Sequence, residues 1–340
     1  MDQIDYKILL LIADGQYHSG QKLAAFLSSS RAALNKRIAK INLFLEQTTQ
    51  KNYFISSTTN RGYCLNKPFD GLQVELIQNN LDSGFKVELC PVIDSTNNYL
   101  ISKNLAPNQF HVCLAELQTA GRGRNTISKI KNWQTPFGNN ISCSIAWQYA
   151  GNQSALIGLS VIAGITVAEV LTTLGCQNVG LKWPNDIFIT NKKVAGILTE
   201  ILGEPNGYCK LIIGIGINVF DNFSQEHMMT LNQQIQQPWT NVISNLATDR
   251  SSKITRNQII TDLLNQFATN YHDFIINGLS MFLQRWNNYD ILQNKIINID
   301  IAGKIKFGTA LGIDNQGALL VNIDGVKQVF HSGEVSVAIV

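Results

Sequence analysis

Several signatures that would narrow the function of a protein are missing from this chain of 340 residues. It has no apolar run of transmembrane length, and its start, Met1-Asp2-Gln3-Ile4-Asp5, has no signal-peptide pattern. The six cysteines are scattered without a Cys-x-x-Cys pair, which indicates neither a zinc site nor a disulfide framework. The five histidines show no metal-ligand spacing. We therefore expect a cytoplasmic protein with reduced thiols and no membrane partner.

Internal repeats and low-complexity tracts are also absent. The distribution of charge, however, distinguishes the N-terminal segment from the rest of the chain. A length of 340 residues and a hydrophobic fraction of 45% allow two or three domains with buried cores. Residues 1–65 hold eight Lys and Arg against four Asp and Glu, whereas the whole chain carries a net charge of only +3. A small basic segment on a near-neutral body is typical of a protein that reads nucleic acid.

The basic segment has the pattern of three helices. Apolar residues at helical spacing end at Asp14-Gly15, which predicts the end of a first helix. Ser19 can cap a second helix that runs to about Leu27, and Ser30 can cap a third that runs to about Phe44. Such an arrangement, with a polar and basic face on the third helix, is typical of a helix-turn-helix.

A weakly alternating run follows the helices, and its Asn60-Arg61-Gly62 predicts the hairpin of a winged version. The residues that we expect to contact DNA are Arg31, Asn35, Lys36, Arg37, Lys40 and Arg61. A solvated charged helix in a small interaction domain is the alternative interpretation of the same pattern.

Two more domains are expected beyond a short linker at Asn66-Lys67-Pro68. In residues 69–285, β-like runs are interspersed with helical stretches, which predicts a mixed sheet with helices packed on one side. Residues 287–340 contain short alternating runs, with hairpin signals at Asp314-Asn315-Gln316-Gly317 and Asp324-Gly325. The expected fold class is therefore α+β, with a small β-barrel at the C-terminal end.

Two blocks of the central domain combine charged residues with glycine or proline. In Gly121-Arg122-Gly123-Arg124, the glycines let the backbone approach a ligand, and the arginines match carboxylate and phosphate oxygens. By itself this pattern is just as typical of a flexible basic surface loop or of a loop that touches nucleic acid. Lys182-Trp183-Pro184-Asn185-Asp186 and Lys193 flank a turn at Thr190-Asn191, so a hairpin should bring Lys182, Asp186 and Lys193 together.

Six blocks in a fixed order carry a resemblance that covers nearly the whole chain. They are Asp94-Ser95-Thr96-Asn97, the Gly-Arg-Gly-Arg loop, Pro136-Phe137-Gly138-Asn139-Asn140, the Lys-Trp-Pro-Asn-Asp block, Lys193-Val194-Ala195-Gly196-Ile197-Leu198 and Gly214-Ile215-Gly216-Ile217-Asn218-Val219. The chain resembles a biotin protein ligase, and its N-terminal segment resembles that of the bifunctional bacterial kind, which also represses the biotin operon. The resemblance implies a winged helix-turn-helix at 1–65, a catalytic domain of the biotin/lipoate ligase type at 69–285 and an SH3-like domain at 287–340.

The resemblance also implies the chemistry. ATP activates the carboxylate of biotin as biotinyl-AMP, and the biotin then passes to a lysine of the biotin carboxyl carrier protein of acetyl-CoA carboxylase. Because two anions must meet, positive groups and Mg²⁺ are expected to offset their charge. The other implied partners are operator DNA and, when the adenylate is bound, a second copy of the chain.

Single residues receive roles from the same resemblance. The expected biotin-binding residues are Ser95, Thr96, Asn97, Gln118, Arg122, Gly123, Arg124, Lys193 and Gly196. The expected ATP and adenylate contacts are Arg122, Arg124, Lys182, Asn185 and Asn218. The expected catalytic residues are Lys193, Arg122, Arg124, Lys182 and Asp186, and Asp186 is also the candidate Mg²⁺ ligand.

Two departures from the family pattern leave alternatives open. Ser28-Ser29 stands where the turn before the third helix usually has a glycine, and residues 125–132 continue the Gly-Arg-Gly-Arg loop without a further glycine. A ligase whose N-terminal domain is not a functional repressor is therefore one alternative. A second alternative is a lipoate ligase, against which Gln118 argues. A third is a biotin-sensing repressor without catalysis, against which Lys182, Asp186 and Lys193 argue.

Overall fold

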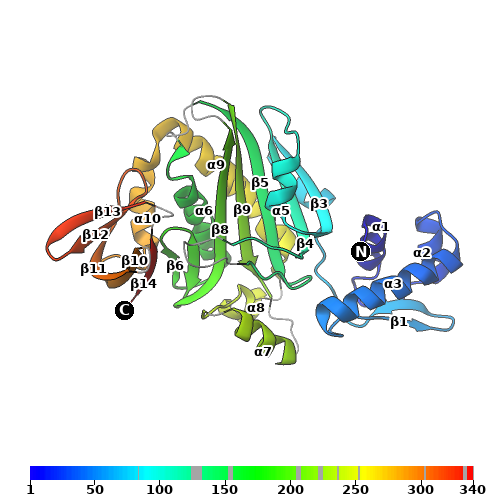
Figure 1. Ribbon diagram of the computed structural model, residues 1–340. Helices are drawn as coiled ribbons and strands as arrows, with labels where there is room; N and C mark the ends of the chain where they lie inside the picture. The colour runs from blue at the N-terminus through cyan, green and yellow to red at the C-terminus, as the bar shows by residue number, and fades with distance from the viewer. Residues whose placement is uncertain are drawn as a thin grey trace.

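The computed structural model describes residues 1–82, 84–123, 132–151, 156–203, 208–220, 225–235, 237–251, 253–301, 304–331 and 335–339. Three parts follow one another along the chain, and the N-terminal and C-terminal parts lie on opposite sides of the central one (Figure 1). The six cysteines all lie in the described residues and are unpaired. Within those residues, no helix combines the length and the apolar character needed to cross a membrane.

The N-terminal part consists of three helices and a two-stranded antiparallel sheet. These elements are α1 (Gln3–Leu11), α2 (Gly20–Phe26), α3 (Arg31–Thr49), β1 (Ile55–Thr58) and β2 (Gly62–Leu65). As predicted, Ser30 caps α3 by accepting a hydrogen bond from the Ala33 N–H. The helix runs on to Thr49 instead of ending near Phe44, because Leu45 and Thr49 continue its buried face. Ser28 has a φ of 48°, so the turn before α3 does contain the strain expected of serine at a left-handed position.

The central part is a seven-stranded sheet with the order β3-β4-β5-β9-β8-β7-β6. The strands are β3 (Phe85–Ile93), β4 (Phe110–Gln118), β5 (Asn140–Ala150), β6 (Val179–Lys182), β7 (Asp186–Ile189), β8 (Lys192–Gly203) and β9 (Tyr208–Asn218). The predicted mixed sheet is confirmed, because β3 and β4 are parallel while the other neighbours are antiparallel.

The described helices of the central part are α4 (Val74–Gln78), α5 (Thr96–Ser102), α6 (Leu159–Leu174), α7 (Gln225–Gln234), α8 (Thr248–Ser251), α9 (Arg256–Asn277) and α10 (Leu283–Tyr289), with 3-10 turns η2 (Ile243–Asn245) and η3 (Leu279–Phe282).

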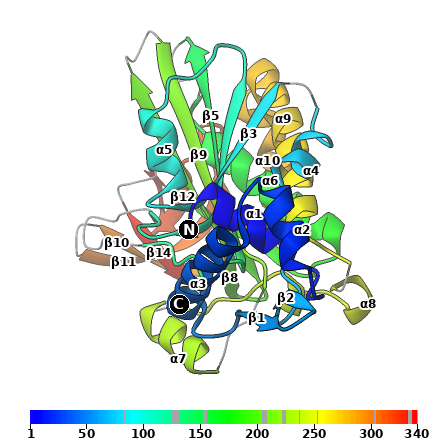
Figure 2. The ribbon, with the colours of Figure 1, turned by 90° about the vertical axis from the view of Figure 1, so that its right-hand side faces the viewer.

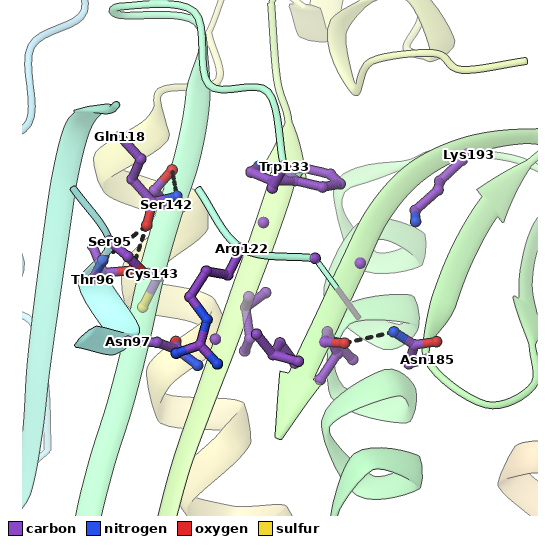
Figure 3. Close-up of a pocket in the computed structure, with 17 residues that line it drawn as sticks. Ser95, Thr96, Asn97, Gln118, Arg122, Trp133, Ser142, Cys143, Asn185 and Lys193 are labelled. Carbon is purple, nitrogen blue, oxygen red and sulfur yellow. Dashed lines mark hydrogen bonds between the residues drawn. The ribbon is translucent and has the colours of Figure 1, made fainter. Parts of the chain in front are cut away.

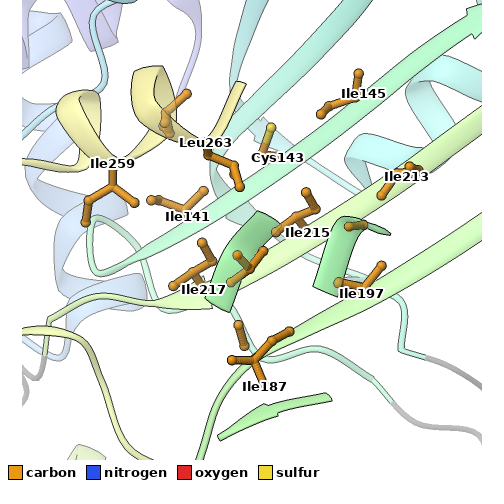
Figure 4. Close-up of a cluster of buried hydrophobic side chains, with 14 of the residues drawn as sticks. Ile141, Cys143, Ile145, Ile187, Ile197, Ile213, Ile215, Ile217, Ile259 and Leu263 are labelled. Atoms are coloured by element: carbon orange, nitrogen blue, oxygen red, sulfur yellow. The ribbon is translucent and has the colours of Figure 1, made fainter. Parts of the chain in front are cut away.

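Helices cover both faces of the central sheet, so the prediction that they pack on one side is wrong. The helices α6 and α9 pack on the face that carries Ile145 and Ile213, and α5 packs on the face that carries Ala146 and Ile212. Alternate residues of a strand point to opposite faces, and here each face carries a cluster of buried apolar side chains. Periodicity therefore does not show which face a helix covers. The larger cluster, between the sheet and the helices α6 and α9, is drawn in Figure 4.

The C-terminal part is a five-stranded antiparallel sheet with the order β13-β12-β11-β10-β14. Its strands are β10 (Ile296–Ile301), β11 (Lys304–Ile313), β12 (Leu319–Ile323), β13 (Val326–Phe330) and β14 (Ser336–Ile339). Helix α10 runs through the boundary expected at 285–287 and buries Trp286. A hydrogen bond of 2.9 Å from the Trp183 indole to the carbonyl of Gly317 ties this sheet to the central part.

A buried group of charges ties the N-terminal part to the central sheet. Arg256 of α9 and Glu116 of β4 are both completely buried, and their Nη1 and Oε2 atoms lie 2.6 Å apart. The hydroxyl of Tyr6, in α1, contacts the same carboxylate, and burial raises the pKa of this tyrosine well above its usual value. Figure 2 shows α1 in front of the central sheet. Helix α1 is thus fixed to β4, the strand that ends at Gln118.

Candidate active site

A cavity opens on the α5 side of the central sheet (Figure 3). Its floor is β9, where Gly214 and Gly216 alternate with buried isoleucines. A Cβ atom at Gly214 would lie 2.3 Å from Oδ1 of Asn97, and one at Gly216 would lie 2.4 Å from Cε2 of Trp133. Both positions need glycine, because other side chains approach the backbone of this strand closely there.

One end of the cavity is a network of buried polar side chains. The backbone N–H and the hydroxyl of Thr96 donate to Oε1 of Gln118 over 2.8 and 3.1 Å. The amide nitrogen of Gln118 donates to the Ser142 hydroxyl over 3.3 Å. The Ser144 hydroxyl lies 2.7 Å from Oγ1 of Thr96 and 2.6 Å from Oδ1 of Asn97. Four predicted residues, Ser95, Thr96, Asn97 and Gln118, therefore line one end together.

The cavity also carries two cations, Lys193 at its other end and Arg122 at its mouth beside Asn97. Nζ of Lys193 lies 2.6 Å from Oδ1 of Asp186, as the predicted hairpin requires, and these side chains are only 14% and 19% exposed. At the mouth, Nη2 of Arg122 lies 2.5 Å from Oε1 of Glu200, and Nη1 donates to Oδ1 of Asn98 over 2.7 Å. Each cation is thus held by a carboxylate of the chain itself.

Only some of the other predicted site residues line this cavity. Gly123, Asn185 and Gly196 line it, but Lys182, Asp186 and Asn218 are not among the described residues that do. The ammonium of Lys182 lies 5.7 Å from the centre of the Phe188 ring. The Asn218 amide accepts from Asn140 and donates to the carbonyl of Thr240, each over 3.1 Å. Arg124 lies outside the described residues. Those residues hold no group of three or more His, Cys, Asp or Glu that could bind a metal ion.

Comparison with known proteins gives the family. Residues 89–218 match the biotin/lipoate A/B protein ligase family, and residues 294–337 match the biotin protein ligase C terminal domain. The chain is 35% identical over 329 residues to the bifunctional ligase/repressor BirA of Salmonella typhimurium, covering 97% of this chain and 96% of the relative. The chain belongs to the biotin protein ligase family. The Escherichia coli BirA is 34% identical over 333 residues, covering 98% of this chain and 97% of that one.

Solved structures support the fold of this ligase family member. The biotin protein ligase from Aquifex aeolicus, in complex with biotin and ATP, matches with a TM-score of 0.59 and 23% identity. The match covers 75% of this chain and 99% of that one. At this identity the likeness concerns the fold alone.

Several residues of this ligase pocket were not predicted from the sequence. Trp133 covers the glycine floor, and its buried Nε1 has no hydrogen-bond partner among the described residues. An unpaired buried donor beside a cavity is suited to a ligand acceptor. Ser142 and Ser144 alternate with Ile141 and Cys143 along β5, and this alternation of small polar with apolar residues is a signal that could have identified them.

The residues predicted to contact DNA fall into two sets. Arg31 and Lys36 are exposed on α3, and Asn35 accepts a hydrogen bond from the Tyr63 hydroxyl. Arg61, in the hairpin turn, lies with its guanidinium 4.1 Å from the centre of the Tyr17 ring. The other set is Arg37 and Lys40, which pair with Asp2 and with the completely buried Asp5. The charges of Arg37 and Lys40 are therefore compensated within the N-terminal part.

Proposed function

We propose that the chain is a biotin protein ligase that forms biotinyl-AMP from biotin and ATP and transfers the biotin to a lysine of a carboxyl carrier protein. The observation that carries this proposal is one cavity with a buried polar network at one end, Lys193 at the other end and Arg122 at its mouth. Biotin has matching groups, because its ureido head carries polar donors and an acceptor and its tail ends in a negatively charged carboxylate. The biotin and ATP in the Aquifex aeolicus structure agree with it.

The polar end serves as the head-group site. A ureido group has two N–H donors and one carbonyl acceptor, which would be costly to bury without partners. Ser95, Thr96, Asn97, Gln118 and Ser142 supply hydroxyl and amide groups for them. The ring of lipoate has sulfur atoms in place of the ureido group, so it would leave these side chains unpaired. This difference favours biotin over lipoate as the substrate.

The two cations serve the reaction. Oxygen of the biotin carboxylate attacks the α-phosphorus of ATP, and the bond to pyrophosphate breaks. Lys193 and Arg122 offset the charge of the approaching anions and stabilise the developing charge of the phosphoryl group. In the second half-reaction the carrier amine attacks the acyl carbon and AMP leaves. Asp186 accepts the proton of that amine, so Asp186→Asn should slow transfer from preformed adenylate.

The remaining predicted ATP contacts are assigned to the nucleotide. Lys182, Asn185, Asn218 and Arg124 are proposed to bind the phosphates and the nucleotide. Asp186 is the carboxylate beside Lys193, and Mg²⁺ in enzymes is commonly held by one or two carboxylates together with substrate phosphates. Asp186 would therefore hold Mg²⁺ with ATP, and the ion would neutralise phosphate charge.

Isotope exchange tests the first half-reaction without a carrier protein. The chain is incubated with ATP, Mg²⁺ and labelled pyrophosphate, with and without biotin. If biotinyl-AMP forms reversibly, label enters ATP only when biotin is present. Exchange that does not depend on biotin, or no exchange at all, would remove the basis of the ligase proposal.

The N-terminal part is proposed to be a winged helix-turn-helix that makes the chain a biotin-responsive repressor of biotin-synthesis genes. Helix α3 presents Arg31, Asn35 and Lys36 to the major groove, and Arg61 of the wing contacts the backbone of the DNA. Few phosphates are neutralised by one such domain, so a single copy should bind weakly. Biotinyl-AMP is proposed to favour a dimer in which two copies read two half-sites together.

Two α3 variants and one ligand test the repressor proposal. Lys36→Ala should weaken operator binding while leaving the melting temperature unchanged, because Lys36 is exposed. Arg37→Ala is the matched control, and it should instead lower the stability of the N-terminal part because Asp5 loses a partner. Operator affinity and the sedimentation coefficient should both rise when biotinyl-AMP is added. Equal affinity with and without the adenylate would leave a ligase with a DNA-binding appendage.

A further inference from the structure

Glu200 of β8 stands behind the pocket and is not among the described residues that line it. Its side chain is 18% exposed. Oε2 accepts a hydrogen bond of 2.7 Å from the amide nitrogen of Asn97, and Oε1 lies 2.5 Å from Nη2 of Arg122. One carboxylate therefore contacts a residue of the polar end and the arginine at the mouth.

The carboxylate determines which way the Asn97 amide faces. An ionised carboxylate only accepts hydrogen bonds, so the –NH₂ group of Asn97 must face Glu200 and the amide oxygen must face away. That oxygen accepts from the Ser144 hydroxyl over 2.6 Å. It also lies directly over the glycine floor, since a Cβ atom at Gly214 would come within 2.3 Å of it. Asn97 thus presents an acceptor, not a donor, to the cavity.

The rest of the polar network is consistent with this direction. The hydroxyl of Thr96 donates to Gln118, which leaves its oxygen lone pairs to accept from Ser144. Ser144 has one hydrogen for these two oxygens, and donation to Asn97 is the choice that pairs the amide oxygen in this orientation. Glu200 is the acceptor-only end of this chain of hydrogen bonds.

We propose that Glu200 is a positioning residue that fixes the Asn97 amide with its oxygen toward the cavity, and so makes the pocket select a ligand head that has N–H donors. This proposal rests on the proposed function, because the ureido head of biotin is the donor in question. A glutamine in place of Glu200 can donate as well as accept, so it would allow Asn97 to turn over and present its –NH₂ group instead. The contact with Arg122 holds the same carboxylate in place.

The orientation of the Asn97 amide can be tested by exchanging the amide at position 97 with the carboxylate at position 200. In Glu200→Gln, biotin affinity should fall about tenfold, as expected when a charge-assisted hydrogen bond no longer holds the acceptor. In Asn97→Asp, two carboxylates meet, so affinity should fall further. The double variant restores one acid and one amide: the introduced amide donates to the introduced carboxylate, whose other oxygen faces Ser144. It should bind biotin at least about tenfold more tightly than Asn97→Asp alone.

Calorimetry with biotin on the full chain gives the four affinities, and thermal melts show which variants fold. Glu75→Gln, on the exposed side of α4, is the matched control and should bind as the unmodified chain does. A folded double variant that binds no better than Asn97→Asp would overturn the positioning role, as would a Glu200→Gln variant with unchanged affinity. If the double variant does not fold, the Glu200→Gln result decides alone. Failure of the unmodified chain to bind biotin would instead refute the proposed function.

Discussion

Replacing Lys193 with glutamine should separate catalysis from folding. The ammonium lies 2.6 Å from Oδ1 of Asp186, and its side chain is 14% exposed. If Lys193 offsets charge in the transition state of adenylation, its loss should slow that step by about a hundredfold or more, the effect of one positioned donor. The lost ion pair is intermediate in burial between exposed and fully buried pairs. The free energy of unfolding should therefore fall by about 1–2 kcal/mol. A folded protein with little adenylation activity is therefore expected.

The assay is biotin-dependent pyrophosphate release in a single turnover, followed by a thermal melt of the same sample. Lys192→Gln is the matched control, because Lys192 is the exposed neighbour of Lys193 on β8. It should release pyrophosphate as fast as the unmodified chain. A Lys193→Gln variant that melts cooperatively and keeps its adenylation rate within about threefold would refute the reasoning, since a positioned donor is worth far more than that.

Three further predictions concern the rest of the molecule. Gly216→Ala should displace Trp133, because the added Cβ would lie 2.4 Å from Cε2, and calorimetry should show biotin affinity about tenfold weaker or worse; unchanged affinity would mean that this indole lies outside the site. Arg256→Met should cost about 3–5 kcal/mol in a urea titration, because it leaves Glu116 buried without its cation; a cost below about 1 kcal/mol would contradict this. Burial raises the pKa of Asp2, but hydrogen bonds from the α1 backbone and from basic side chains of α3 lower it more, to well below its usual value. Because the folded-state pKa is the lower one, Asp2 stabilises the fold at neutral pH and stops doing so as the pH falls below the usual carboxyl range. Asp2→Asn should therefore flatten the acid side of the stability curve, and an unchanged curve would count against the pairing.

Much of the site could be predicted because its residues stand in local patterns. The glycines of β9 interrupt a strand of buried isoleucines, and a turn at Thr190-Asn191 brings Lys193 back beside Asp186. Ser95 to Asn97 begin α5 next to the end of β4, so their meeting with Gln118 follows from two short elements. The hairpin followed from spacing along the chain, whereas the roles of Ser95, Thr96, Asn97 and Gln118 came from the resemblance to the family.

Residues that depend on distant partners could not be predicted in the same way. Glu200 occupies an ordinary position in β8, and its partner Arg122 is 78 residues away along the chain. Arg37 resembles a solvated residue on a helix face, but Asp2 lies 35 residues before it and meets it in space. The side of the sheet covered by α5 was missed because each face of the sheet carries a cluster of buried apolar side chains. Pairing across long separations depends on the whole fold, which no local pattern contains.

Transfer of biotin to a carrier tests the central claim most directly. The purified chain is incubated with ATP, Mg²⁺ and a biotin carboxyl carrier domain, with either biotin or lipoate, and the mass of the carrier is measured. We expect a single biotinyl group on a carrier lysine, formation of AMP and pyrophosphate, and no change of mass with lipoate. An unmodified carrier in the presence of biotin, or a carrier that gains lipoate, would contradict the account.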